Sequence, residues 1–275
     1  MRVSRFWLQG LVSLLAILLS SASVRAQTIG SSARHMEQGS WRLSVYHQGA
    51  MNEDLEFDVG TSGTCSSPNA PVATFACGST GTVTAEGDSE AEIAKITFQP
   101  YERMQYYIAG GVGNYRLKAS TLSARGDSLG TIMGAGVKAL IMSESLVTPA
   151  IALDAGVVLE RYNFNRSNGA LATIDERLEL IRTQIALEGS KRFEIDDKIT
   201  LEPYGGMKWL RTRAIIKDLT TGDRQSGVQN TITPFVGLSL PVFDSEGFFI
   251  EGSFVDGVQY AAGLSVGFGG SEKKG

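Results

Sequence analysis

Residues 198–210, KITLEPYGGMKWL, carry the two-sided pattern that decides the fold of this chain. In an extended chain successive side chains point to opposite faces, so Leu201 and Trp209 share one face and Glu202 and Lys208 share the other. A soluble sandwich strand would turn the charged face to water. A strand of a membrane barrel would turn the apolar face to lipid and the charged face to the lumen. The choice depends on whether the pattern recurs.

The N-terminus, residues 1–26, has the features of a secretory signal peptide. Arg2 and Arg5 precede the apolar run 11–19, and small residues then lead to a cleavage site after Ala26, with Val24 at position −3. The apolar run is shorter than the about 20 apolar residues that a membrane-spanning helix needs. We therefore expect residues 1–26 to be removed and the mature chain to be exported.

The charge of the mature chain argues against nucleic acid as a partner. Removal of Arg2, Arg5 and Arg25 with the signal peptide leaves 22 basic and 29 acidic residues, a formal net charge of −7. No later segment approaches the about 18 consecutive apolar residues of a spanning helix. A mature protein in a membrane would therefore cross it with strands.

Two cysteines, Cys65 and Cys77, are expected to form one disulfide, because an exported chain reaches an oxidising compartment. Closing a loop of about 15 residues is worth roughly 3 kcal/mol in the chain-entropy model. No CxxC motif and no basic neighbour favours a redox role. The pair is interpreted as a structural staple.

Alternation recurs along the whole mature chain and predicts ten strands. Most have about nine to thirteen residues, which suits tilted membrane strands of about 9–11 residues better than soluble strands of about five or six. The predicted strands are residues 40–48, 91–99, 104–117, 131–142, 151–160, 177–190, 198–210, 230–241, 248–255 and 258–268.

The connections between these strands alternate between short and long. Outer-membrane barrels have short periplasmic turns and long external loops, and the exception here is the tight turn at Asp256 and Gly257. We expect an all-β, transmembrane, antiparallel up-and-down β-barrel of ten strands, with eight or twelve as alternatives. The expected parts are a periplasmic N-terminal arm (27–39), the barrel (40–268) with a long first external loop (49–90), and a polar C-terminal tail (269–275).

Three stretches, YYIAGGVGNY (106–115), GAGVKALIM (134–142) and YAAGLSVGF (260–268), resemble the small outer-membrane β-barrel proteins of Gram-negative bacteria. This group includes OmpA-like and opacity-type barrels, and the resemblance covers about residues 40–268. It implies location in the cell outer membrane, contact with its lipid and lipopolysaccharide, and insertion by the barrel-assembly machinery. Members usually end in a strand closed by an aromatic residue, and Phe268 has that phase, although seven residues follow it.

If the apolar faces touch lipid, ten charged side chains point into the lumen. A lysine or arginine turned to the bilayer midplane would cost about 2–4 kcal/mol, which favours this phase. Five are basic and five are acidic: Arg42, Lys95, Lys138, Arg182 and Lys208, with Asp154, Glu160, Glu188, Glu202 and Glu251.

Two roles for these balanced charges are open. Buried charges need partners, so the set can be a structural salt-bridge network that plugs a narrow lumen. The alternative is a narrow ion pathway gated by the same pairs, although a ring of like charge, typical of strongly selective pores, is not evident. We expect a non-enzymatic barrel with a structural or adhesion-type role through its external loops, with a narrow porin-like channel as the alternative. A soluble secreted β-protein is a third class.

Catalytic and metal signals are weak. His35 and His47 are the only histidines, and neither lies in an HxS or HExxH pattern. Ten strands are also found in the omptin proteases, and Asp54 and Asp58 could approach His47, but the spacing matches no omptin motif; a lipid A-modifying enzyme has no better support. No catalytic residue, cofactor or metal site is predicted.

The first predicted loop is strongly acidic. A divalent cation bridging it to lipopolysaccharide or to an external surface partner is one interpretation, since hard cations prefer clustered carboxylates. A solvated, mutually repelling loop is the simpler one. The carboxylates are Glu53, Asp54, Glu56, Asp58, Glu86, Asp88 and Glu90.

Overall fold

The computed structural model describes residues 33, 36–59, 81–119, 122–126, 128–167, 173–196, 199–219, 222, 224–241, 246–254 and 257–269. The signal peptide, His35, Cys65 and Cys77 lie outside these ranges, so the expected cleavage and disulfide stay predictions. No helix in the described part of the chain has the length and apolar character needed to cross a membrane.

Ten strands form a ring, and two four-residue strands, β4 (Leu122–Arg125) and β8 (Phe193–Asp196), are additions that pair with β3 and β9. The ring strands are β1 (Trp41–Val59), β2 (Gly81–Tyr101), β3 (Met104–Ala119), β5 (Gly130–Met142), β6 (Ala150–Ser167), β7 (Thr173–Ser190), β9 (Ile199–Asp218), β10 (Arg224–Pro241), β11 (Glu246–Ser253) and β12 (Val258–Phe268).

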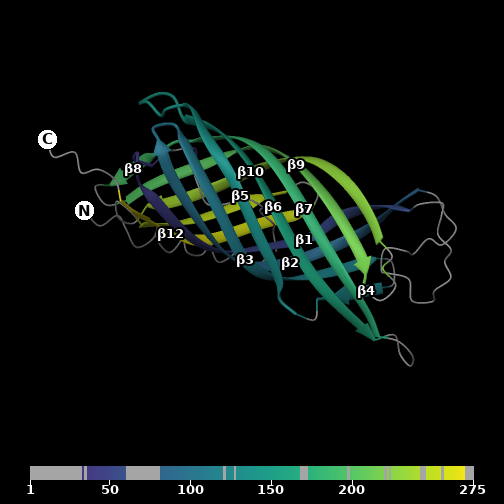
Figure 1. Cartoon of the computed structure of the whole chain (residues 1–275). Helices are drawn as coiled ribbons and strands as arrows, with labels where there is room; N and C mark the ends of the chain where they lie inside the picture. The colour runs from purple at the N-terminus through teal and green to yellow at the C-terminus, as the bar shows by residue number, and fades with distance from the viewer. Residues whose placement is uncertain are drawn as a thin grey trace, which may run out of the picture.

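Each ring strand is antiparallel to its two neighbours, and the ring closes where β1 pairs with β12, from Trp41 opposite Phe268 to Met51 opposite Val258. Apart from the two added strands, neighbours in the ring are neighbours in sequence, and the strands run obliquely around the barrel (Figure 1). All ten predicted strands are present among the described residues. The expected antiparallel up-and-down β-barrel is confirmed.

The two ends of the barrel differ. At the end where Trp41 and Phe268 meet, the ring strands are joined through residues 102–103, 143–149, 191–198 and 242–245; we call it the turn end. At the opposite, loop end they are joined through residues 60–80, 120–129, 168–172, 219–223 and 254–257.

The expected first loop, 49–90, is wrong, because β1 continues to Val59 and β2 begins at Gly81. A β-bulge between Ala50 and Glu53, with Asn52 at φ 55°, inserts residues into β1 and shifts its phase. Even-numbered residues such as Ala50 face inward before the bulge, and odd-numbered ones face inward after it. A sequence pattern of strict period two therefore ends at the bulge although the strand does not.

Large apolar side chains cover the outer face of the ring in a belt. A continuous apolar surface of this kind is rare in water-soluble folds and typical of a lipid-facing wall, and it agrees with the phase that points the predicted charges into the lumen. The belt includes Trp41, Leu43, Val45, Ile96, Ile108, Met133, Leu153, Val157, Leu159, Ile185, Leu187, Met207, Trp209, Ile232, Val236, Phe248, Leu264 and Val266.

The wall has one irregular sector at the loop end. Strands β11 and β12 are short, so β10 loses its β11 partner beyond Phe235 and β1 loses its β12 partner beyond Met51. Above the short hairpin, β1 and β10 lie against each other: a Cβ added to Gly227 of β10 would be 1.8 Å from the carbonyl oxygen of Glu56. Only glycine permits so close an approach.

Candidate functional site

The lumen collects the charged side chains that the sequence singled out. Nine of the ten predicted residues are buried, each 6% exposed or less, and Arg42, near the turn end of β1, is half-buried. The nine are Lys95, Lys138, Asp154, Glu160, Arg182, Glu188, Glu202, Lys208 and Glu251. The structure divides them into a central group and a group nearer the loop end.

The central group is built around lysine ammonium groups. Lys138 on β5 forms an ion pair with Glu188 on β7, and Nζ of Lys208 lies 3.8 Å from Oε1 of Glu251. Nζ of Lys95 lies 4.4 Å from the centroid of the Tyr107 ring, a cation–π arrangement. Opposite charges and aromatic faces therefore surround the buried cations.

Tyrosines complete the central group. The hydroxyl of Tyr107 donates to Asp154 Oδ1 (2.9 Å), and the hydroxyl of Tyr204 donates to Glu251 Oε2 (3.2 Å). Tyr107 fits only because the adjoining wall is glycine: a Cβ added to Gly136 would be 2.2 Å from its hydroxyl oxygen. The glycine-rich strands thus make room for inward aromatic side chains.

A second group lies nearer the loop end and is centred on Arg182 of β7. Its guanidinium pairs with Glu53 of β1, with Nη2 to Oε2 at 2.9 Å, and its Nε lies 3.0 Å from Glu160 of β6. The hydroxyls of Tyr115 and Tyr162 donate to Glu53 and Glu160 (3.1 and 2.9 Å). Because β1 and β7 are not neighbours in the ring, the Arg182–Glu53 pair spans the lumen.

Glu53 is a lumen residue that the sequence reasoning placed in the acidic loop. The sequence feature that predicts its inward direction is the alternation that begins again after the bulge, in which Glu53, Leu55 and Phe57 share one face. The structure also separates Glu202 from Lys208, whose ion-pair partner is Glu251. Among the described residues, Oε1 of Glu202 has no hydrogen-bond partner.

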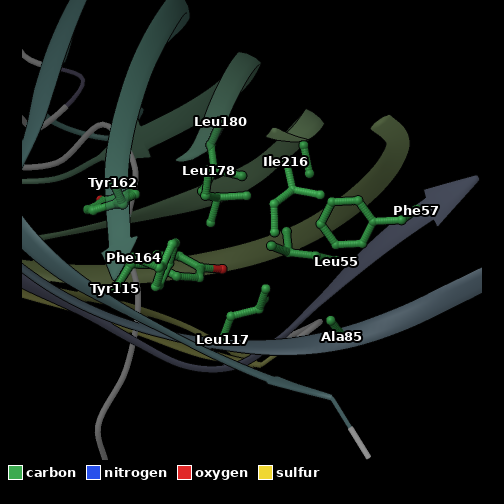
Figure 2. Packing of buried hydrophobic residues seen from close by; sticks show 11 residues of the cluster. Leu55, Phe57, Ala85, Tyr115, Leu117, Tyr162, Phe164, Leu178, Leu180 and Ile216 are labelled. Atoms are coloured by element: carbon green, nitrogen blue, oxygen red, sulfur yellow. The ribbon is translucent and has the colours of Figure 1, made fainter. Parts of the chain in front are cut away.

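An apolar cluster fills the lumen at the loop end, beyond Arg182; we call it the outer plug (Figure 2). It draws side chains from β1, β2, β3, β6, β7 and β9, and each is 2% exposed or less. They converge from strands around the lumen in Figure 2. The members are Leu55, Phe57, Ala85, Tyr115, Leu117, Tyr162, Phe164, Leu178, Leu180, Ala214 and Ile216.

The turn end is occupied by part of the N-terminal arm. Ala33, 1% exposed, packs with Leu140, Ala150 and Ala152, and the backbone N–H of Met36 donates to Gln99 Oε1 (2.7 Å). The sequence predicts only a periplasmic arm at residues 27–39. The described residues of this arm close against the inner wall.

The structure does not bring the histidine and aspartates of the weak omptin-like hypothesis together in a site. His47 lies on the outer face, with Nδ1 at 2.8 Å from Glu92 and Nε2 at 3.0 Å from the Tyr260 hydroxyl. Asp54 and Asp58 also face outward, farther along β1. Within the described ranges, no group of three or more His, Cys, Asp or Glu side chains has the arrangement needed to hold a metal ion.

A closed antiparallel ring, an apolar outer belt and a charged interior occur together in this chain. Over the belt the ring strands have their backbone paired on both sides, except β10 at Ile232, where the pairing with β11 has ended; paired backbone is the condition for crossing hydrocarbon with strands. The chain is a transmembrane β-barrel of the outer-membrane type. Its location is the outer membrane.

Comparison with solved structures finds proteins of similar fold at low sequence identity. The translocator domain of the autotransporter NalP from Neisseria meningitidis is 12% identical, with 86% of this chain and 90% of that chain covered and a TM-score of 0.49. The outer membrane protease OmpT from Escherichia coli is 12% identical (86% and 100% covered, TM-score 0.44). The outer membrane protein OprG from Pseudomonas aeruginosa is 9% identical (86% and 99% covered, TM-score 0.39).

No family model and no curated protein matches the sequence. The assignment as an outer-membrane barrel therefore rests on the geometry of this chain.

Proposed function

We propose that this barrel is closed and non-enzymatic, and that it acts as a structural or surface-interaction protein through the segments at its loop end. The observation that carries the proposal is the outer plug, in which eleven side chains from six strands leave no member more than 2% exposed. Moving an ion from water through a dry apolar layer costs far more than thermal energy supplies.

The ten predicted charges and Glu53 form, in this proposal, a structural network beneath the plug. Buried ions must be paired, and the ion pairs of Arg182, Lys138 and Lys208 meet that requirement. The network holds β1, β2, β5, β6, β7, β9 and β11 around a common polar centre. Its role is to give the buried charged side chains their hydrogen-bond and ion-pair partners and to make the narrow lumen rigid.

The loop end is, in this proposal, the external end. Six ring strands are far longer than the about 9–11 residues that cross the hydrocarbon: β1 has 19 residues, β2 21, β6 18, β7 18, β9 20 and β10 18. Their excess lies at the loop end and carries charged outer faces. Projecting β-structure of this kind offers a surface for lipopolysaccharide or an external partner.

The alternative function is a narrow channel for ions or small solutes. The observation in its favour is the charged central lumen, where buried Lys95, Lys138 and Glu188 could line a polar path. Conduction would require the outer plug to move aside.

Cysteine labelling tests whether the loop end of the barrel lies at the cell surface. In a chain with Cys65 and Cys77 replaced by serine, Glu56→Cys places a thiol on the exposed outer face of β1, and Leu146→Cys places one in the turn 143–149, where Leu146 is 97% exposed. A membrane-impermeant maleimide should label Glu56→Cys on intact cells and Leu146→Cys only after permeabilisation. The reverse pattern would contradict the external assignment of the loop end.

Liposome swelling tests closure against the channel alternative. Liposomes containing the refolded protein should swell in small sugars no faster than protein-free liposomes. Faster swelling that changes in the double variant Lys138→Gln/Glu188→Gln would instead support the channel, because that variant replaces the two charged side chains by neutral polar ones.

A further inference from the structure

Five basic side chains gather on the outer face of β7, β9 and β10, on the loop-end side of the apolar belt. Arg211, Arg213, Lys217 and Arg224 are exposed and Arg177 is half-buried. The three residues of β9 lie at odd positions, so they share the outward face of the lipid-facing Trp209. We call these five residues the basic collar.

The register places like charges directly opposite one another. Arg177 of β7 pairs with Lys217 of β9, and Lys217 pairs on its other side with Arg224 of β10. Three cations thus form one row across three adjacent strands, about 4.8 Å apart. Like charges in directly opposed positions destabilise a sheet. A bound anion would reduce the repulsion within this row.

The collar has no anionic partner of its own among the described residues. Arg211, Arg213, Lys217 and Arg224 make no ion pair there. Arg177 donates from Nε to Asn163 Oδ1 (3.1 Å), which holds its guanidinium toward the outer face. The neighbouring Arg161 has an anionic partner, because its Nε lies 3.2 Å from Oε1 of Glu179, and it is not part of the collar.

The collar sits where the headgroups of the outer leaflet begin. Arg211 follows Trp209 by two residues and Lys217 follows it by eight. At about 3.3 Å per residue and a strand tilt near 40°, these positions lie about 5 Å and about 20 Å above the Trp209 row. Two tiers result: Arg211 and Arg213 next to the hydrocarbon, and Arg177, Lys217 and Arg224 farther out.

We propose that the basic collar binds the phosphates of an outer-leaflet glycolipid of the lipopolysaccharide type. The lower tier contacts the phosphates on the glucosamine backbone, and the upper tier contacts phosphates of the attached core sugars. Arginine is suited to this because its planar guanidinium donates two parallel hydrogen bonds to one phosphate. The inference requires the outer-membrane location and holds whether or not the lumen conducts.

The sector of the ring formed by β1 and β2, which lies beside β10 at the loop end, makes the binding one-sided. On β1 and β2, Asp54 and Glu86 are opposed in register on the outer face, and Asp88 and Glu90 follow on β2. An anionic lipid is repelled there unless a cation intervenes. A bound glycolipid should therefore be ordered over β7, β9 and β10.

Two variants and a matched control test the proposal on the full mature chain, refolded in detergent. The lower-tier variant is Arg211→Gln/Arg213→Gln, and the upper-tier variant is Arg177→Gln/Lys217→Gln/Arg224→Gln. The control is Arg116→Gln/Lys118→Gln, which removes outward cations from the loop end of β3, where Lys118 is paired with Asp88 (2.6 Å). Each variant is first shown to be folded: without boiling, its electrophoretic mobility should match that of the unboiled wild type.

Binding is measured with fluorescent lipopolysaccharide and with fluorescent lipid A, which lacks the core sugars. Because both probes carry the phosphates that the lower tier contacts, the lower-tier variant should bind both probes at least about tenfold more weakly, a loss of about 1.4 kcal/mol or more. The upper-tier variant should lose affinity for lipopolysaccharide and keep its affinity for lipid A. The control should match the wild type.

Three results would overturn the proposal. One is equal binding by the wild type and both collar variants, and another is an equal loss in the Arg116/Lys118 control. The third concerns the source of the phosphate: inorganic phosphate at millimolar concentration that displaces the probe completely would identify a site for free anions. Dephosphorylated lipid A should bind the wild type as weakly as phosphorylated lipid A binds the lower-tier variant.

Discussion

Arg182 is the single side chain on which the packing at the loop end most depends. It is 3% exposed and reaches two carboxylates from two different strands, Glu53 and Glu160, each of which also accepts from a tyrosine. Loss of the guanidinium would leave both carboxylates buried without their cation. Removing one partner of a buried ion pair is much more costly than never having the pair.

The variant Arg182→Met is therefore expected to lower the free energy of unfolding by about 3–5 kcal/mol. Guanidinium unfolding of the refolded barrel, followed by tryptophan fluorescence, measures it. Arg161→Met is the control, because Arg161 forms an exposed pair with Glu179 that is worth little. Equal midpoints for the two variants would show that the pair across the lumen does not stabilise the barrel.

Gly136 supports a second prediction at this scale. Gly136→Ala would bring a methyl group to 2.2 Å from the Tyr107 hydroxyl, so Tyr107 must move and its bond to Asp154 is lost. We expect a loss of about 1–3 kcal/mol. Gly110→Ala, with no atom within 4 Å of the added Cβ, should change stability far less.

Combining Gly136→Ala with Tyr107→Ala separates the steric cause from a backbone cause. If the tyrosine ring is the main obstacle, Gly136→Ala should cost less in a chain that already carries Tyr107→Ala, where the carbonyl oxygen of Ala155, 2.6 Å from the added Cβ, is the remaining obstacle. An unchanged cost in both backgrounds would assign the effect to that backbone contact with β6.

Most of these residues could be predicted from the sequence, because the phase of each strand determines which charged side chains point into the lumen. Lys95, Lys138 and Arg182 alternate with lipid-facing apolar residues, so their inward direction could be derived. Which charges meet could not be derived, since pairing depends on side-chain reach across the lumen. Lys208 accordingly lies near Glu251 of β11 and not near Glu202, its neighbour in the same strand.

At the scale of elements, the bulge in β1 has the largest consequence. It turns Glu53, Leu55 and Phe57 inward, and so it supplies both an acid to Arg182 and apolar groups to the outer plug. Beyond it, the backbone of β1 is close enough to Gly227 of β10 to close the wall above the short β11–β12 hairpin.

Gly227→Val tests this closure. The new side chain would collide with the carbonyl of Glu56, so the loop-end part of β1 should separate from β10. Hydrogen exchange of the amides of residues 53–58 should become faster, while exchange in β5 and β6 stays unchanged. Ser226→Val, at the adjacent outward position, should leave exchange as in the wild type.

The ten ring strands could be predicted because each keeps a strict alternation over the membrane-spanning part. Their continuation toward the loop end could not, for two reasons. The bulge interrupts the period in β1, and the outer faces beyond the belt are charged, as in Asp54 and Arg213, so the contrast between apolar and polar faces is inverted. Strands β4 and β8, four residues each, are too short to produce a periodic signal.

At the scale of the whole molecule, the lumen has layers of opposite character. The N-terminal arm closes on the inner wall at the turn end, the charge network occupies the centre, and the outer plug fills the loop end. The sequence predicts the central charges but not the plug, because seven of its residues lie outside the predicted strands: Leu55, Phe57, Ala85, Tyr162, Phe164, Ala214 and Ile216. A path through the molecule would have to cross all of these layers.

The outer surface is also divided, with carboxylates over β1 and β2 and the basic collar over β7, β9 and β10. A net charge says nothing of this division, which arises only when the ring brings distant strands together. The collar and the plug are therefore properties of the assembled barrel.

Single-channel recording in planar bilayers tests closure of the lumen most directly. The refolded wild type should insert without discrete conductance steps. The variant Leu178→Ala/Leu180→Ala/Ile216→Ala, which removes bulk from three strand positions of the outer plug, should show them, and so proves that insertion occurs under the same conditions. Steady conductance steps from the wild type, equal to those of the plug variant, would contradict a lumen closed by its own side chains.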